Sequence, residues 1–156
     1  NKLVSTDKKN AAQRYFKMAN GVYQTGYFGN AWAFINYGWS YYAAYEKPKY
    51  MYDQDFKLAT KAKQWYLKAR SLSNDAEFKA KCTFMLAKCE QKNRVNTALS
   101  LSNWYDLGYT ERNSRLYKAN RNNRYFAELK QSYGQTAYFK KAVNECSYLG
   151  DFVASK

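Results

Sequence analysis

The apolar residues of this chain recur at helical spacing in three stretches, at about 10–47, 53–92 and 122–149. Positions three or four residues apart share one face of a helix, so each stretch predicts a pair of helices. One Pro and 7 Gly give few turn signals for a many-stranded sheet. We therefore predict a single all-α domain over 1–156 in which antiparallel hairpins stack, because one hairpin cannot bury all its apolar faces alone.

The first hairpin contains an uncharged stretch from Met18 to Tyr45. Gly26 and Gly29 flank its predicted turn, and Asn30 can cap the second helix. The stretch is long enough to span a bilayer, but its amide side chains and four Gly favour packing within the protein, so we predict no membrane span. The predicted faces are Tyr15, Met18, Ala19, Val22 and Tyr23, then Ala31, Ile35, Gly38, Tyr42 and Tyr45, with an end near Pro48.

The second hairpin begins with a helix that Asp53 or Asp55 can cap. Residues 71–74 form the predicted turn, and Asn74 followed by Glu77 resembles a capping box at the next helix. The predicted face of the first of these helices is Phe56, Ala59, Ala62, Tyr66 and Ala69.

The second helix of this hairpin has apolar residues on two sides, so we expect it to pack between two neighbours. Lys88 and Lys92 suit its C-terminal end. Its two stripes are Phe78, Cys82, Met85 and Cys89, and Ala80, Phe84 and Ala87.

Beyond this helix, 93–121 lacks a regular pattern and predicts a short helix followed by a long loop. A third hairpin then starts near Asn122, with Gly134 as a stop signal and Thr136 as the cap of its last helix.

The first hairpin places aromatic, large apolar and small residues at Tyr15, Met18, Ala19, Tyr23 and Gly26, then at Ala31, Ile35 and Gly38, and the spacing recurs at Ala62, Tyr66 and Ala69. This pattern resembles a tetratricopeptide repeat. That resemblance implies a short right-handed superhelix with a concave groove that binds extended peptides, and a scaffold role. The run 65–90 is also similar to helical-repeat proteins of the bacterial cell envelope, which favours the envelope or periplasm over the cytoplasm. Because the chain starts without Met, we expect either a mature or trimmed product or a piece of a longer protein.

Residues for catalysis or metal binding are scarce. The chain has no His and no GxSxG, HExxH or P-loop motif. Its three Cys lack CxxC spacing, and we expect Cys82 and Cys89 to be buried thiols. We therefore predict a non-catalytic protein that has neither a metal nor a cofactor. The resemblance to tetratricopeptide repeats implies that it binds a protein or peptide partner.

Two groups of residues are candidates for binding. The aromatic hairpin has more rings than one core can hold, and the resemblance places a peptide-binding Asn at Asn20. The partner-binding candidates are Asn20, Tyr27, Trp32, Tyr37, Trp39 and Tyr41.

The second group is basic, in a chain of net charge +14 that favours acidic partners. Five cations recur every third residue with no acid between them, which suits nucleic acid or an acidic glycan, or else a solvated loop. These anion-binding candidates are Arg112, Arg115, Lys118, Arg121 and Arg124.

Overall fold

The computed structural model describes residues 8–38, 40, 47–99, 104 and 106–155. All regular structure within these residues is helical, which confirms the all-α prediction. The helices are α2 (Lys8–Gln24), the 3₁₀ turn η1 (Trp32–Phe34), α3 (Met51–Leu58), α4 (Thr60–Ser71), α5 (Ala76–Leu99), α6 (Tyr109–Arg121), α7 (Arg124–Tyr133), α8 (Ala137–Glu145) and α9 (Ser147–Ala154).

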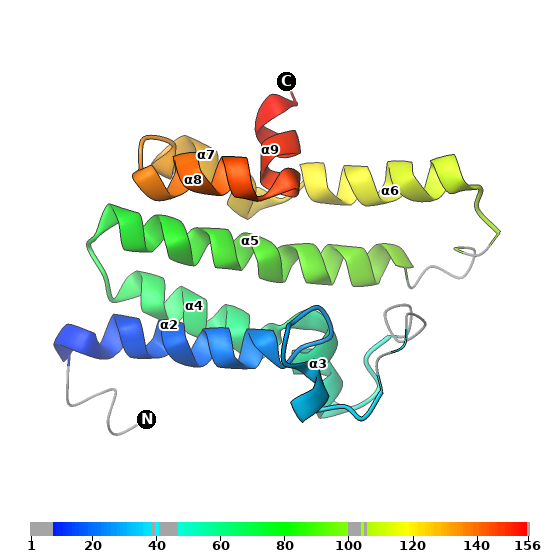
Figure 1. Cartoon of the computed structure of the whole chain (residues 1–156), viewed down its shortest axis with the longest axis horizontal. Coiled ribbons are helices and arrows are strands. Elements are labelled where there is room, and N and C mark those ends of the chain that lie inside the picture. Colours follow the sequence, from blue (N-terminus) through cyan, green and yellow to red (C-terminus); the bar gives the residue numbers. More distant parts are fainter. Residues whose placement is uncertain (1–7, 39, 41–46, 100–103, 105, 156) are drawn as a thin grey trace.

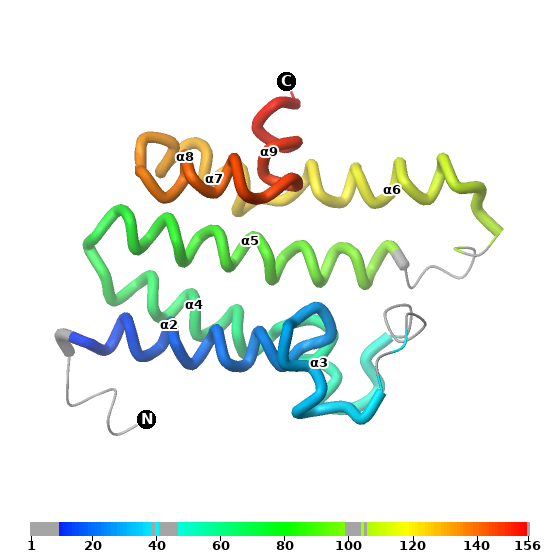
Figure 2. The backbone as a smooth tube through the Cα atoms, in the orientation of Figure 1, coloured from blue at the N-terminus to red at the C-terminus, as the bar shows by residue number. Residues whose placement is uncertain are grey.

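The long helix α5 forms the middle layer of the molecule (Figure 1). Helices α2, α3 and α4 lie on one side of it, and α6, α7 and α8 lie on the other, with α9 rising from the upper layer. The chain reverses between α2, α4, α5 and α6 in turn (Figure 2). The two apolar sides predicted for this helix therefore correspond to two packed faces.

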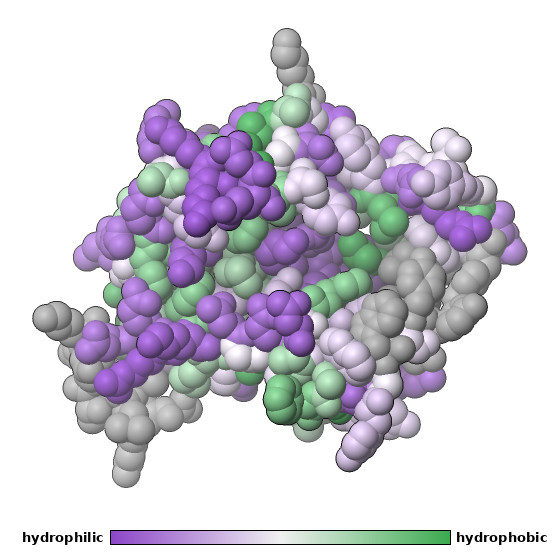
Figure 3. Space-filling model, in the orientation of Figure 1, coloured by the Kyte–Doolittle hydropathy of each residue, from purple (hydrophilic) through white to green (hydrophobic). Residues whose placement is uncertain are grey.

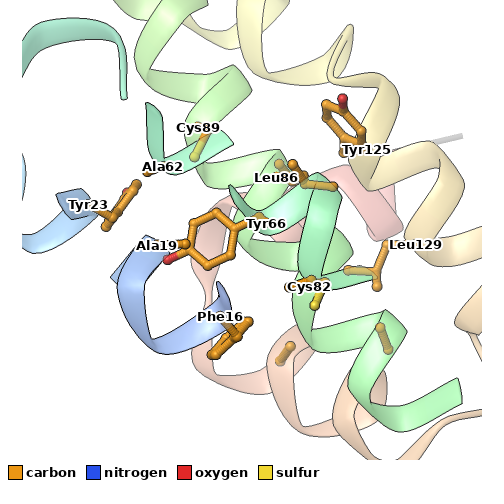
Figure 4. Packing of buried hydrophobic residues seen from close by; sticks show 14 of the residues in the cluster. Phe16, Ala19, Tyr23, Ala62, Tyr66, Cys82, Leu86, Cys89, Tyr125 and Leu129 are labelled. Carbon is orange, nitrogen blue, oxygen red and sulfur yellow. The ribbon is translucent and has the colours of Figure 1, made fainter. Parts of the chain in front are cut away.

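Helices α2 and α4 pack closely because small residues line their contact. Ala19, Ala62 and Ala69 are fully buried, so the two backbones can approach. The Tyr66 ring lies beside Phe16, with ring centroids 5.3 Å apart, and its hydroxyl donates to the Asn20 side-chain oxygen. Figure 4 shows this cluster between the helices.

The predicted face from Phe56 to Ala69 is buried at all five positions, but it belongs to two helices. Ala59 has φ 54° and ψ 37°, the left-handed conformation that ends α3 and turns the chain into α4. Asp53 does not precede the helix as expected. It sits in the first turn of α3, where its carboxylate accepts from the backbone N–H groups of Lys49 and Tyr50.

The second helix of the first hairpin was predicted wrongly within the described residues. After Gln24 the chain folds back on α2: the backbone N–H of Ala31 donates to the Gln24 carbonyl. A Cβ at Gly29 would collide with the same carbonyl, which explains the glycine. Between the end of α2 and residue 38 only η1 is helical, and the side chain of Ile35 is 54% exposed instead of packed. The predicted positions Tyr42 and Tyr45 lie outside the described residues.

The prediction of an irregular segment at 93–121 is also wrong. Helix α5 continues to Leu99, and α6 covers Tyr109–Arg121. The apolar pattern missed α6 because this helix has no buried residue. Good helix formers such as Arg, Lys and Leu can sustain a helix without an apolar stripe.

The C-terminal hairpin forms as α7 and α8, with small changes at the helix ends. The Thr136 hydroxyl accepts from the backbone N–H of Phe139, confirming the predicted cap. Asp75, not Asn74, caps α5, because its carboxylate accepts from the backbone N–H of Glu77. The Glu77 carboxylate instead accepts from two backbone N–H groups at the start of α8. The chain continues beyond this hairpin as α9, which begins at Ser147.

Candidate binding groove

A row of three neighbouring pockets runs between α5, α6 and the C-terminal helices. The central pocket, about 300 Å³, lies between α5, α6 and α9. It shares Arg121 and Phe152 with the C-terminal pocket of about 470 Å³ beside α7. At its other end it shares Val95 and Tyr148 with the lysine pocket of about 210 Å³ beside α2. We refer to these three pockets together as the groove. Figure 3 shows a depression between the upper and lower layers, bordered by polar and apolar side chains.

Helix α6 supplies one wall of the central pocket. Asn113, Tyr117 and Asn120 lie on one face of this helix and line the pocket with Leu116. The amide nitrogen of Asn120 donates to the Leu116 carbonyl at 3.1 Å. Its side-chain oxygen is buried and has no hydrogen-bond partner among the described residues. A buried acceptor without a donor costs free energy, so this oxygen is suited to a donor that enters the pocket.

The lysine pocket combines aromatic rings with two ammonium groups. Tyr23, Phe28 and Tyr148 line it together with Lys88 and Lys92. Lys92 is only 3% exposed, and its Nζ lies 3.7 Å from the Tyr23 ring centroid. Burial lowers the pKa of Lys92 to about 8, and the neighbouring charge of Lys88 pushes it in the same direction.

Three lysines of the groove donate hydrogen bonds to neutral oxygens. These contacts do not neutralise their positive charges. Lys88 Nζ donates to the Gln91 side-chain oxygen at 3.0 Å. Lys92 Nζ donates to the Tyr23 carbonyl, and Lys130 Nζ to the Val153 carbonyl, both at 3.3 Å. Among the described lining residues only Asp151 is acidic. The groove is therefore positively charged.

The partner-binding candidates lie in different environments in the structure. Tyr27 is 3% exposed, and its hydroxyl donates to the Ser40 carbonyl, so its ring belongs to a core cluster with Phe56 and Trp104. Trp32 packs partly against the same cluster, whereas Tyr37 is fully exposed. Asn20 accepts from the Tyr66 hydroxyl inside the α2–α4 contact. Trp39 and Tyr41 lie outside the described residues.

The five basic candidates do not form one surface. Because a helix turns 100° per residue, Arg112 and Arg121 lie on opposite sides of α6. Arg112 Nε donates to the Leu107 carbonyl, and Arg115 pairs with Glu111 at 3.0 Å. The remaining positions are Lys118, exposed on α6, Arg121, which lines the groove, and Arg124, which lies on α7 over the Tyr125 ring.

Sequence reasoning missed the groove residues that the structure brings together. Lys92 was assigned to a helix end, but α5 continues past it and turns it inward. The spacing of Lys88, Gln91, Lys92 and Val95 on one helical face was the signal available. The sequence around Asn120 did not indicate a pocket, because the residues that face it across the pocket come from other helices.

Other chemistry is limited in the part of the chain that the structure describes. Cys82 and Cys89 are fully buried, as predicted, and all three cysteines are free thiols. No group of three metal-ligating side chains occurs among the described residues. None of the described helices has the length and apolar character needed to cross a membrane.

Comparisons with protein-family models, with curated proteins and with solved structures give no match to this chain. The resemblance to tetratricopeptide repeats therefore stays a prediction, and the function must be argued from the groove itself.

Proposed function

We propose that this protein is a non-catalytic interaction module that binds an extended peptide segment of a partner protein in the groove. The observation that carries this proposal is the buried side-chain oxygen of Asn120, which lacks a donor in the central pocket. A peptide backbone supplies N–H donors, and one of them would remove the cost of leaving this oxygen unpaired.

The other groove residues support the same kind of ligand. The side-chain amides of Gln91, Asn113, Asn120 and Gln131 both donate and accept, as a peptide backbone does. The rings of Tyr117, Tyr148 and Phe152 offer apolar surface for side chains of the bound peptide. The positive charge of the groove favours a peptide with acidic residues.

Nucleic acid or an acidic glycan is the alternative ligand, and the arrangement of charges favours it less. A nucleic-acid site needs several cations that follow one backbone. Here Arg112 and Arg115 are engaged with protein oxygens, and only Arg121 of the five basic candidates lines the groove.

Selection of a library of random linear peptides on the purified chain tests the proposal. Peptides enriched on the wild type are then titrated against Asn120→Ala, Asn113→Ala and the control Asn74→Ala by fluorescence anisotropy. Asn74 is an exposed amide in the α4–α5 turn, outside the groove. We expect Asn120→Ala to weaken binding about tenfold or more, and Asn74→Ala to leave it unchanged.

Two results would contradict this function. One is that no peptide is enriched, or that the enriched peptides bind the Asn120→Ala variant as tightly as the wild type. The other is tight binding of single-stranded RNA or a heparin oligosaccharide that falls steeply with salt, which would favour the alternative.

A further inference from the structure

The lysine pocket is built differently from the rest of the groove. Its walls are the rings of Tyr23, Phe28 and Tyr148, with two ammonium groups at one side. Among the residues that the structure describes, no carboxylate lines this pocket. Cations and rings without an acid are a combination suited to an anion that carries an apolar body.

Lys92 is the residue whose charge lacks compensation. A buried ion is costly unless it is paired and hydrogen-bonded. Lys92 is only 3% exposed, yet among the described residues its Nζ contacts just two neutral groups, the Tyr23 carbonyl and the Tyr23 ring. An ammonium group has three N–H donors, so a bound oxygen anion could take the donors that this carbonyl does not use.

Lys88 places a second positive charge on the same face of α5, one helical turn earlier. The Gln91 side-chain oxygen accepts from its Nζ at 3.0 Å, and the Tyr148 ring lies below it at 5.4 Å. These contacts fix Lys88 over the pocket. Burial lowers the pKa of Lys92, and the like charge of Lys88 adds to this effect. An anion between the two ammonium groups would counteract both causes.

The rim of the pocket offers apolar surface that the fold does not cover. Phe28 is 49% exposed and Tyr148 is 47% exposed, and both line the pocket. Its volume of about 210 Å³ is below the usual range for drug-sized ligands, so it fits a small molecule of roughly one ring with a short chain.

We infer that the lysine pocket binds a small aromatic carboxylic acid, with the carboxylate between Lys88 and Lys92 and the ring against Phe28 and Tyr148. This site goes beyond peptide binding in the groove. The lysine pocket is one end of the groove, so a bound peptide and the acid could compete for it. Binding of the acid does not depend on the peptide function, because Asn113 and Asn120 do not line the lysine pocket.

Isothermal titration calorimetry of the purified chain with 3-phenylpropionate, its neutral amide and inorganic phosphate tests this inference. We expect the acid to bind about tenfold or more tightly than either the amide, which lacks the charge, or phosphate, which lacks the ring. Lys92→Met and Lys88→Met should each weaken binding of the acid by a similar factor. Lys79→Met, on the same helix but outside the pocket, should leave it unchanged.

The result that would overturn the inference is equal affinity for the acid and its amide, or no binding of the acid by the wild type. Phosphate binding as tight as the acid would also overturn it, because the rings would then contribute nothing. Lys88 is more accessible than Lys92, so Lys88→Met keeps the test decisive if Lys92→Met fails to fold. Asn120→Ala should bind the acid as the wild type does, which separates this site from the peptide function.

Discussion

Helix α5 meets its neighbours in two different ways. Against α4 and α7 it packs fully buried side chains, such as Leu86, against Tyr66 and Leu129. Toward α6 it faces a helix without any buried residue, and a pocket lies between them. Both regions are helical, although α6 has no fully buried side chain and only partly buried ones such as Leu116. The packed region stabilises the fold, and the loosely packed region leaves room for a ligand.

Matched leucine truncations give the largest expected difference between the two regions. Leu86→Ala should lower the free energy of unfolding by about 3 kcal/mol, because it removes apolar contacts and leaves a cavity. Leu116→Ala, on α6 beside the central pocket, should cost less than about 1 kcal/mol, because that side chain is only partly buried. Urea unfolding followed by circular dichroism measures both. Similar losses would mean that α6 belongs to the core.

Asn123 joins α7 to α5 and offers the next largest effect. Its side-chain oxygen accepts from the backbone N–H groups of Tyr125 and Phe126, and its amide nitrogen donates to the Ala87 carbonyl. Asn123→Ala removes a buried helix cap and should cost about 2 kcal/mol. The neighbouring Asn122 is exposed, so Asn122→Ala should cost less than about 0.5 kcal/mol. Equal values in urea unfolding would refute the assigned role of the cap.

The buried thiols of the packed region predict a loss of stability in alkali. Burial raises the pKa of Cys82 and of Cys89 from 9.0 to about 12. Below pH 9 both states keep these protons, whereas between pH 9 and 12 only the unfolded chain releases them, so stability falls as the pH rises. Each thiol should contribute about 1 kcal/mol of this loss between pH 8 and pH 10.

The double variant Cys82→Ala/Cys89→Ala is the control for this effect. Its unfolding free energy should fall less steeply over the same pH range than that of the wild type. An unchanged slope would show that the thiols reach solvent in the folded protein.

Substitutions of two arginines compare the ion pairs of the two regions, and we expect them to give the smallest difference in stability. Arg70 of α4 contacts Thr83 of α5 and Glu128 of α7, so Arg70→Ala should cost about 1 to 2 kcal/mol. Among the described residues, Arg115 pairs only with Glu111 on its own helix, and the two side chains are 30% and 53% exposed. Arg115→Ala should change stability by less than about 0.5 kcal/mol. A larger change in thermal unfolding would indicate that α6 is held by its charges.

The packed region was predictable because the buried face of each helix carries apolar residues at regular helical spacing. The face from Phe56 to Ala69 and the two stripes of α5 follow the helical repeat. That face is buried at every position, and the stripes are buried except at Phe84 and Met85, which are partly buried. What this period did not predict is the break at Ala59, because a left-handed alanine has no local signature.

The loosely packed region was less predictable for the same physical reason. Helix α6 has no apolar stripe, so it resembled a loop. In the first hairpin the spacing of Ala31, Ile35 and Gly38 matches that of a helix. The backbone N–H groups of Asn30 and Ala31 instead donate to the side-chain and backbone oxygens of Gln24, which holds the chain in a turn. The sequence carried a signal for one wall of the groove, the α5 face with Lys88 and Lys92, but not for the groove as a whole. Its other walls come from segments between Tyr23 and Ser155 that only the fold brings together.

Native-state hydrogen exchange tests most directly whether α6 is a groove wall instead of part of the core. The slowest amides of α4 and α5 should exchange only through global unfolding, whereas those of α6 should open at free energies at least about 2 kcal/mol lower. If the slowest amides of α6 are as protected as those of α5, then α6 is part of the cooperative core, and this account of the groove is wrong.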